Sequence, residues 1–250
     1  MPRPPRQISK SGYYHVVLRG IGRQLLFEST EERQDFLRIL ARTRDKFGCV
    51  IIAWCLMGNH VHLLLKVADG NLSRAVASIS ISFAMHHNAR TEHVGHVFQN
   101  RFSSKPIESD GQLLACVRYI HDNPAKAGMC APSKYAWSSY GEYVGAPSPI
   151  GVPIVDTTLI LGMVDGETGF EQLSSSNMEA YREPRGMAKL TDAEAKRVFE
   201  EDLSAESRAA LFGGTKRTRD AALRELKNYG LTGKQIERLT GIGRNVIQRA

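Results

Sequence analysis

The chain has 250 residues, of which 42% are hydrophobic and 24% charged, and this composition excludes collagen-like, disulfide-rich and wholly disordered proteins. No apolar run reaches the ~20 residues of a membrane-spanning helix, and the first residues lack the apolar core of a signal peptide. We therefore expect a protein of the cytoplasm, with one large domain or two smaller ones. The four cysteines are widely spaced without a C-x-x-C pair, so we expect them to be reduced.

The net charge of +7 is unevenly distributed. Residues 1–145 hold 18 basic and 11 acidic side chains, residues 146–188 hold 2 and 6, and residues 189–250 hold 13 and 9. Two basic regions flanking an acidic one suit contact with a polyanion, nucleic acid being the first candidate. A solvated surface with a basic bias explains the charge equally well.

The sequence of residues 13–67 predicts three strands and a helix. Tyr13–Arg19 is rich in aromatic and β-branched residues, which favours a strand, and Thr30–Phe47 has helical apolar spacing with Thr30 as a plausible N-cap. Residues 49–56 are too apolar for anything but a buried strand. Gly58-Asn59 indicates a turn, and residues 60–67 then form the second strand of a hairpin.

The following elements complete an α+β pattern. Residues 72–88 return to helical spacing, residues 95–107 indicate a loop and a short strand, and residues 110–123 form a helix that ends before Pro124. The order strand–helix–strand–strand–helix–strand–helix predicts a ferredoxin-like antiparallel sheet with helices on one face.

The C-terminal part predicts a separate module. We expect a domain over residues 1–145, an acidic linker with weak helices over residues 146–188, and a helical module over residues 189–250. Within that module, Thr232 can cap a helix, and a turn at residues 240–242 precedes a candidate recognition helix, as in a helix-turn-helix. A plain helical bundle or a dimerisation module is the alternative.

The motif Asn59-His60-Val61-His62 is the sharpest local feature. Because strand side chains alternate between faces, His60 and His62 point the same way and form a candidate pair of divalent-metal ligands. By itself an H-x-H motif is more often a pair of structural or exposed histidines.

The helix over residues 110–123 offers two further candidates. Tyr119 and Asn123, spaced i,i+4, lie together on one flank of its apolar stripe and could turn a phenol and an amide oxygen toward a site on the sheet. The alternative is a partly buried tyrosine and an asparagine that ends the helix.

Five stretches together resemble a known family, namely residues 13–28, 54–65 (WCLMGNHVHLLL), 95–107, 116–128 (CVRYIHDNPAKAG) and 135–145. In this order they resemble the REP-associated tyrosine transposases, relatives of the single-tyrosine insertion-sequence transposases within the HUH endonuclease superfamily. The combination of W-C-L-M-x-N-H-V-H with R-Y-I-H-x-N-P is highly specific. One departure is Ser103-Ser104, where a basic residue is common in the family.

The resemblance implies a catalytic role for each candidate residue. His60 and His62 would be metal ligands, Asn123 the third ligand, and Tyr119 the nucleophile. The metal would be Mg²⁺ or Mn²⁺ acting as Lewis acid and template. The product would be a 5′-phosphotyrosine with a free 3′-OH. The targets would be single-stranded or hairpin DNA of palindromic repeats, and the protein a nucleoid-associated monomer rather than a dimer.

Aromatic and basic residues interleave in the expected loops, which suits base stacking and phosphate contact on single strands. We expect about half of the aromatic ones, which include Trp137, Tyr140 and Tyr143, to be structural. The expected DNA contacts are Arg19, Phe98, Arg101, Phe102, Lys105, Arg118, Arg244, Asn245 and Arg249.

Two other functions stay open. One is a zinc hydrolase that uses His60 and His62 with Glu, Asp or Cys as third ligand, and the other is a DNA-binding regulator that kept the fold without the activity.

Overall fold

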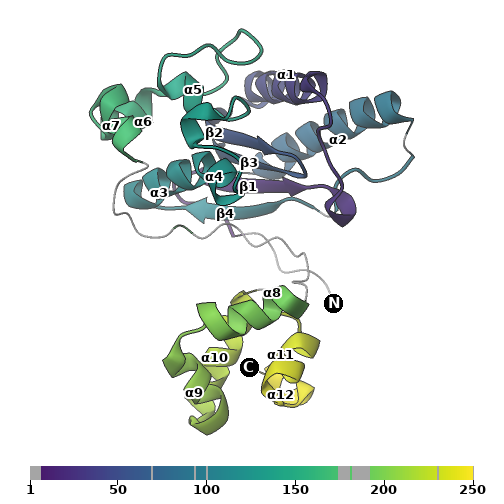
Figure 1. Cartoon of the computed structure of the whole chain (residues 1–250), viewed down its shortest axis with the longest axis vertical. Helices are drawn as coiled ribbons and strands as arrows, with labels where there is room; N and C mark the ends of the chain where they lie inside the picture. Colours follow the sequence, from purple (N-terminus) through teal and green to yellow (C-terminus); the bar gives the residue numbers. More distant parts are fainter. Residues whose placement is uncertain are drawn as a thin grey trace. The chain divides into compact units, whose positions relative to one another are not determined.

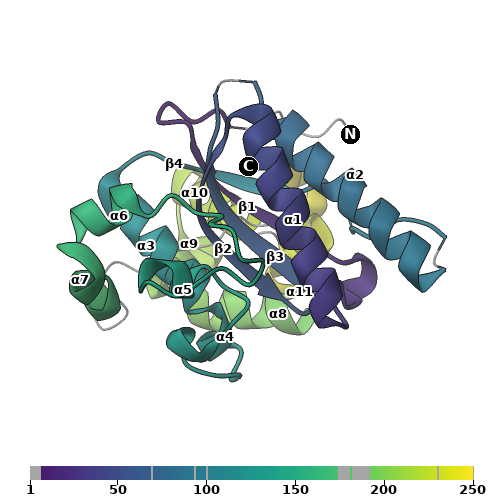
Figure 2. The same ribbon diagram turned by 90° about the horizontal axis from the view of Figure 1, so that it is seen from above.

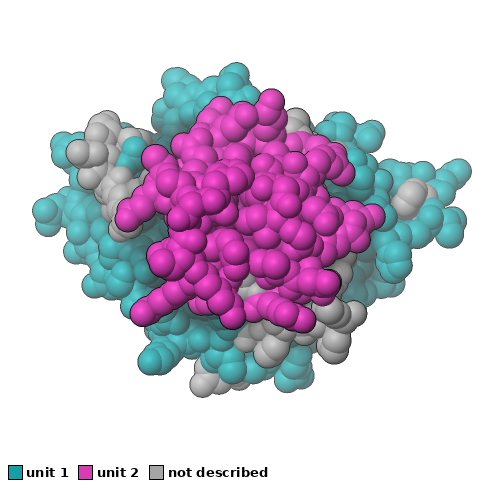
Figure 3. All heavy atoms as spheres, turned by 90° about the horizontal axis from the view of Figure 1, so that it is seen from below, with its two compact units in different colours: residues 1–186 teal, residues 187–250 magenta. Residues whose placement is uncertain are grey.

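A computed structural model describes residues 7–68, 70–92, 94–99, 101–173, 181, 192–229 and 231–249. It divides into two compact units, Met1–Gly186 and Met187–Ala250, coloured teal and magenta in Figure 3. Each unit has its own hydrophobic core, and each is described by itself.

The first unit is built on a four-stranded antiparallel sheet (Figure 1). Its strands are β1 (Tyr13–Arg19), β2 (Val50–Met57), β3 (His60–Lys66) and β4 (Ser103–Ile107), in the order β2-β3-β1-β4. Consecutive interior residues of β1, β2 and β3 are buried whichever face they point to, so both faces of the sheet are covered. The predicted α+β fold with its ferredoxin-like order of elements is confirmed.

Two long helices, α1 (Thr30–Phe47) and α2 (Leu72–Thr91), lie side by side over the sheet in Figures 1 and 2. The rings of Phe27, Phe36 and Phe83 meet beneath them at centroid distances of 5.3–5.6 Å. The predicted bounds of α1 are confirmed, but its N-cap is Ser29 and not Thr30. Glu32 stands three residues after Ser29 and closes a capping box with it, which decides between the two neighbouring hydroxyls.

The helix expected over residues 110–123 is two helices. α3 (Asp110–His121) packs against β2 and β3, and the short α4 (Asn123–Lys126) follows, with Pro124 in its first turn. Proline has no N–H to offer the helix interior but is tolerated at this position, so the chain turns at Asp122 and continues as a helix.

Residues 146–173, expected to be part of a linker, are packed against the first unit. They include two short helices, α6 (Thr158–Met163) and α7 (Gly166–Leu173), and Ile154, Ile160 and Phe170 are buried in the core of that unit. The ring of Phe170 stacks on Tyr143 at 4.4 Å. These residues are therefore part of the first unit and not a linker. Of the remainder of the expected linker, only Tyr181 is among the described residues. The short elements η1 (Ile21–Arg23), η2 (Pro132–Lys134) and α5 (Tyr140–Tyr143) connect the larger ones.

The second unit is helical. It comprises α8 (Asp192–Arg197), a π-helical turn η3 (Val198–Asp202), α9 (Ala205–Gly213), α10 (Lys216–Asn228), α11 (Gly233–Thr240) and α12 (Arg244–Arg249). Thr232 caps α11 as predicted, and Gly241 turns the chain in the left-handed conformation that ends the helix. Leu223, Leu226, Ile236 and Ile247 form its core.

Within the described residues, no helix is both long and apolar enough to cross a bilayer. Cys49, Cys55, Cys116 and Cys130 are all free thiols, as the spacing predicted.

Candidate active site

The β1–β3 ladder places the two motif histidines on one face of the sheet. His62 lies opposite Val17 and His60 opposite Arg19, so the side chains of all four residues share that face. The rings of His60 and His62 are 4.9 Å apart. His62 is fully buried and His60 half-buried, which makes a pair of imidazoles at the end of a covered strand.

Both imidazoles are held neutral by their surroundings. Burial, assisted by the positive charge of Arg19, lowers the pKa of His60 to about 4. Burial lowers the pKa of His62 well below its usual value, and the nearby His15, His60, Arg19 and Lys126 act in the same direction. A neutral imidazole keeps a nitrogen lone pair, and a metal ligand needs one.

Neighbouring side chains hold the Nδ1 atom of each histidine. His60 Nδ1 lies 2.7 Å from Asn59 Oδ1, and because a carboxamide oxygen accepts, this Nδ1 carries the proton and His60 Nε2 carries the lone pair. His62 Nδ1 lies 3.0 Å from Nε2 of a third histidine, His15 on β1.

Helix α3 brings Tyr119 to the same face. The Tyr119 ring lies 5.8 Å from the ring of His62 and 5.9 Å from that of His15. The Nζ of Lys126, one turn beyond the start of α4, lies 4.0 Å from the centre of the Tyr119 ring. The structure therefore unites the predicted nucleophile with the predicted histidine pair and adds a cation.

Asn123 is buried beside Tyr119 and has a fixed orientation. Its Nδ2 donates to the backbone oxygen of Tyr119 at 2.8 Å and approaches that of Ile120 at 3.4 Å. Because the amide nitrogen is used in this way, the Oδ1 atom is the one available as a ligand.

Among the described residues, neither a carboxylate nor a cysteine joins the two histidines as a third metal ligand. No group of three His, Cys, Asp or Glu side chains that could hold a metal ion occurs in the part of the chain that the structure describes. The third ligand that a zinc hydrolase would need from Glu, Asp or Cys is therefore not found among those residues.

Two of the site's residues, His15 and Tyr181, were not among the sequence candidates. His15 Nδ1 lies 2.9 Å from the hydroxyl of Tyr181, whose ring is 5.2 Å from that of Tyr119. His15 lies in a correctly predicted strand, two residues before Val17, so its side chain is on the same face of the sheet as that of His62. That proximity follows only from the pairing of β1 with β3, which the sequence did not reveal. Nothing in the sequence marks Tyr181, which follows an acidic stretch far beyond the recognised motifs.

The expected DNA contacts of the first unit are dispersed around this face. Lys105 on β4 lies opposite His15, with its Nζ 4.5 Å from the Tyr181 ring. Arg101 is exposed, Arg118 pairs with Asp122 at 3.4 Å, and Phe98 and Phe102 are half-buried against the core.

The aromatic residues expected in the last loop are mainly structural. Tyr143 is fully buried and donates to the backbone oxygen of Ile52 at 2.7 Å, Tyr140 is buried, and Trp137 packs under Arg33. His121, two residues after Tyr119, points away from the site and contacts Ser139 Oγ at 2.8 Å.

The three expected contacts of the second unit lie on its last helix. Arg244, Asn245 and Arg249 on α12 are exposed, and Arg244 pairs with Glu237 of α11 at 2.7 Å.

Comparisons with known proteins show what this fold and sequence are similar to. Residues 8–123 match the family model described as IS200-like transposase. A REP-associated tyrosine transposase of Haemophilus influenzae is 24% identical over 155 residues, which cover 56% of this chain and 86% of the relative. The solved structure of a REP-associated tyrosine transposase bound to a REP hairpin shares the fold, with a TM-score of 0.50 and 19% identity over 62% of this chain and 94% of that one. The chain is therefore similar to the IS200-like transposases over residues 8–123, and to a REP-associated tyrosine transposase over a longer stretch.

Proposed function

We propose that this protein cuts one strand of hairpin DNA formed by palindromic repeats, and that Tyr119 is the nucleophile. The observation that carries the proposal is the position of the Tyr119 ring, 5.8 Å from the ring of His62 within a neutral histidine pair. A hairpin is the DNA that the structurally similar transposase binds.

The donor set fits a divalent cation. Nε2 of His60 and Oδ1 of Asn123 are uncharged donors with lone pairs, and Nε2 of His62 is a third when the proton of that ring lies on Nδ1. Nitrogen and amide oxygen ligands suit Mn²⁺ or Mg²⁺. When bound, the cation supplies Lewis acidity toward a phosphate oxygen and orients the scissile phosphate. Three protein ligands leave open positions for substrate.

The chain's own groups perform the transfer. The Oη of Tyr119 forms a bond to phosphorus while the bond from phosphorus to the 3′ oxygen breaks, which leaves a 5′-phosphotyrosine and a free 3′-OH. The phenol loses its proton to water and the departing 3′ oxygen takes one up from water, so no net proton is gained or lost. The ammonium group of Lys126 beside the ring stabilises the negative charge that develops on the phenol. The phosphotyrosine bond retains the energy for rejoining strands.

Basic side chains around the site would hold the strand. Arg101 is exposed, and Arg19 and Lys105 border the histidine face on β1 and β4. We assign phosphate contacts to these three residues and to Arg118, and base stacking to the accessible parts of Phe98 and Phe102.

Hairpins cut from the flanks of the protein's own gene, incubated with Mn²⁺, test the proposal. A covalent protein–DNA adduct that resists denaturation is expected. Binding of hairpins without an adduct in any metal would instead identify a regulator without activity. Cleavage without an adduct would favour a hydrolase, the zinc enzyme included. We expect the enzyme to act as a monomer. Measurement of its molecular mass in solution, with hairpin DNA and Mn²⁺ present, checks this.

The second unit would bind duplex DNA through α11 and α12, with α12 as recognition helix. Residues 209–250 hold nine basic and three acidic side chains, and Arg244, Asn245 and Arg249 project from α12. Since the substrate is chromosomal DNA, the protein would reside on the nucleoid.

Deletion of residues 189–250 tests this second role. The deletion removes 13 of the 33 basic residues. Each lost phosphate contact flattens the dependence of log affinity on log salt by roughly one unit. We expect weaker binding with a shallower salt slope, while a short hairpin at saturating concentration is still cut. Equal affinity and slope in both forms would assign these helices to assembly instead.

A further inference from the structure

Three side chains from distant parts of the first unit form one hydrogen-bonded row behind the proposed metal ligands. His62 Nδ1 lies 3.0 Å from His15 Nε2, and His15 Nδ1 lies 2.9 Å from the hydroxyl of Tyr181. Tyr181 also forms a side-chain hydrogen bond with Cys116 on α3. The row runs from β3 through β1 to the last described residue of this unit.

The row is buried. His15, His62 and Cys116 are all fully enclosed. Among the described residues, the charged or titratable groups that face His15 are Lys105, Tyr119, Tyr181 and His62. None of these is acidic enough to stabilise an imidazolium, so His15 is neutral and carries one proton, on either Nδ1 or Nε2.

Only two proton arrangements satisfy the row. In the first, Tyr181 donates to His15 Nδ1 and His15 Nε2 donates to His62 Nδ1, which leaves the proton of neutral His62 on Nε2. In the second, His62 Nδ1 donates to His15 Nε2, His15 Nδ1 donates to the Tyr181 oxygen, and the Tyr181 hydroxyl turns to the Cys116 sulfur. The contact between Tyr181 and Cys116 gives that hydroxyl proton a partner in the second arrangement.

The second arrangement is the one that frees His62 Nε2 as a ligand. It also matches the neighbouring histidine, because Asn59 Oδ1 accepts from His60 Nδ1 and so leaves His60 Nε2 with its lone pair. Both imidazoles, whose ring centroids are 4.9 Å apart, then offer the same atom, Nε2, as a ligand. The partner on the far nitrogen of a ligating histidine fixes its tautomer and ring orientation.

We propose that His15 is a positioning residue which, held by Tyr181, accepts the Nδ1 proton of His62 and thereby presents His62 Nε2 to the divalent cation. This inference rests on the proposed function, since it concerns the same metal site. It also gives Tyr181 a role in that site.

Nitrogen-15 NMR of the histidine side chains in the metal-free, unmutated protein tests the tautomer directly. Long-range proton–nitrogen correlations distinguish a protonated Nδ1 from a protonated Nε2. We expect His62 to be protonated at Nδ1 and His15 at Nδ1. Protonation of His62 at Nε2 would overturn the proposal, and this measurement needs no variant to fold.

Mn²⁺ affinity, followed by the electron paramagnetic resonance of the free ion, tests the consequence. His15→Phe removes the acceptor at similar size and should weaken Mn²⁺ binding about 10- to 100-fold, the usual cost of losing a partner behind a metal ligand. His15→Gln places an amide oxygen near the position of Nε2 and should restore most of the affinity. Tyr181→Phe should cause a smaller loss, because His15 Nε2 remains.

Two further proteins separate the possible failures. His87→Phe removes a buried histidine from α2 and should leave Mn²⁺ affinity unchanged. His62→Ala should lose it. If His62→Ala binds Mn²⁺ as the unmutated protein does, the proposed metal site itself is wrong. If His62→Ala loses binding and His15→Phe does not, the metal site stands and the role of His15 is overturned.

Discussion

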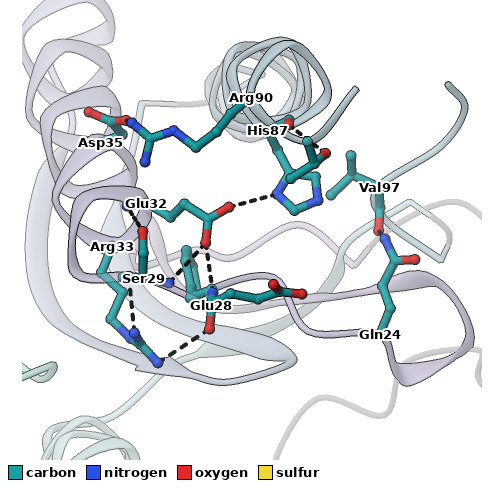
Figure 4. A network of polar contacts seen from close by, with 11 residues as sticks. Gln24, Glu28, Ser29, Glu32, Arg33, Asp35, His87, Arg90 and Val97 are labelled. Carbon is teal, nitrogen blue, oxygen red and sulfur yellow. Dashed lines mark hydrogen bonds and ion pairs between the residues drawn. The ribbon is translucent and has the colours of Figure 1, made fainter. Parts of the chain in front are cut away.

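The first unit contains two polar clusters with buried histidines, and only one of them includes a carboxylate. Around α1 and α2, His87 Nδ1 lies 3.3 Å from Glu32 Oε1, and Glu32 in turn accepts from the backbone N–H groups of Glu28 and Ser29 (Figure 4). Around β1 and β3, His15, His60 and His62 face one another with no carboxylate among them. Burial is similar, since His87 is 7% exposed and His62 is fully enclosed.

The difference shows how the same residue type serves structure or chemistry. The Glu32 carboxylate accepts hydrogen bonds from two backbone N–H groups and lies beside His87, so it satisfies the local backbone donors. The imidazoles of the sheet have hydrogen-bonding partners at Nδ1, which leaves their Nε2 atoms as the candidate ligands of a cation. The four predictions below test that contrast, from the largest expected effect to the smallest.

Tyr119→Phe should abolish cleavage completely while hairpin binding persists within a few-fold. The variant loses the attacking oxygen but keeps the ring, which contacts His62 and Lys126. Adduct formation and binding of the same hairpin measure the two effects. A residual adduct on this variant would point to Tyr13 or Tyr14 as the nucleophile.

His60→Ala or His62→Ala should remove metal-dependent cleavage, whereas Asn123→Ala should reduce it less. A neutral amide is the weakest of the three ligands, and water can partly replace it. His87→Ala is the matched change in the other cluster and should leave turnover per folded molecule intact. Unchanged metal affinity and turnover in Asn123→Ala would refute its assignment as third ligand.

His121→Phe should alter the acid stability of the first unit. Burial lowers the pKa of His121 to about 3, and it faces Ser139, Tyr140, Tyr143 and Phe170. Because the unfolded chain binds a proton near pH 6.5 and the folded one does not, the neutral histidine costs stability as pH falls from about 6.5 toward 3. The pH-dependent part of the difference between unmutated protein and variant should be about 2 kcal/mol between pH 7 and pH 5.

Urea unfolding of both proteins at the two pH values measures that difference. The unmutated protein should lose more stability on acidification than His121→Phe does. Parallel losses in the two proteins would mean that His121 takes up its proton in the folded state, contrary to its buried setting.

Glu32→Gln should have the smallest effect, about 1 kcal/mol of unfolding free energy, as expected for weakening hydrogen bonds to a charged acceptor. The amide oxygen can still accept from the Ser29 and Glu28 N–H groups, and the amide nitrogen can face His87. Thermal unfolding measures the loss. Mn²⁺ affinity should not change, and a parallel decrease in that affinity would show that the two clusters are coupled.

Local patterns predicted the regular elements well, because short-range physics determines them. The alternation of His60 and His62 and the i,i+4 spacing of Tyr119 and Asn123 were sufficient to propose the site, although Asn123 begins α4 rather than ending α3. The N-cap of α1 could also have been predicted correctly. Glu32 stands three residues after Ser29, and this capping-box spacing favours Ser29 over Thr30.

Long-range packing accounts for what the sequence did not reveal. Ile154, Ile160 and Phe170 lie in a stretch where apolar residues, such as those of Leu159–Val164, alternate with polar and acidic ones without a clear helical or strand period. Their burial therefore depends on the first unit they pack against. His15 reaches His62 only through strand pairing, and Tyr181 reaches His15 only because the chain returns to the sheet.

The stacking of Phe170 on Tyr143 has a consequence for the exchange of modules between proteins of this kind. A chain cut at residue 145, where the recognisable motifs end, would expose the ring of Tyr143 and lose the residues that cover it. A functional joint must therefore lie after α7, which ends at Leu173. Recombination that joins the first unit to a new C-terminal partner must therefore include residues 146–173, although this stretch contains no recognisable motif.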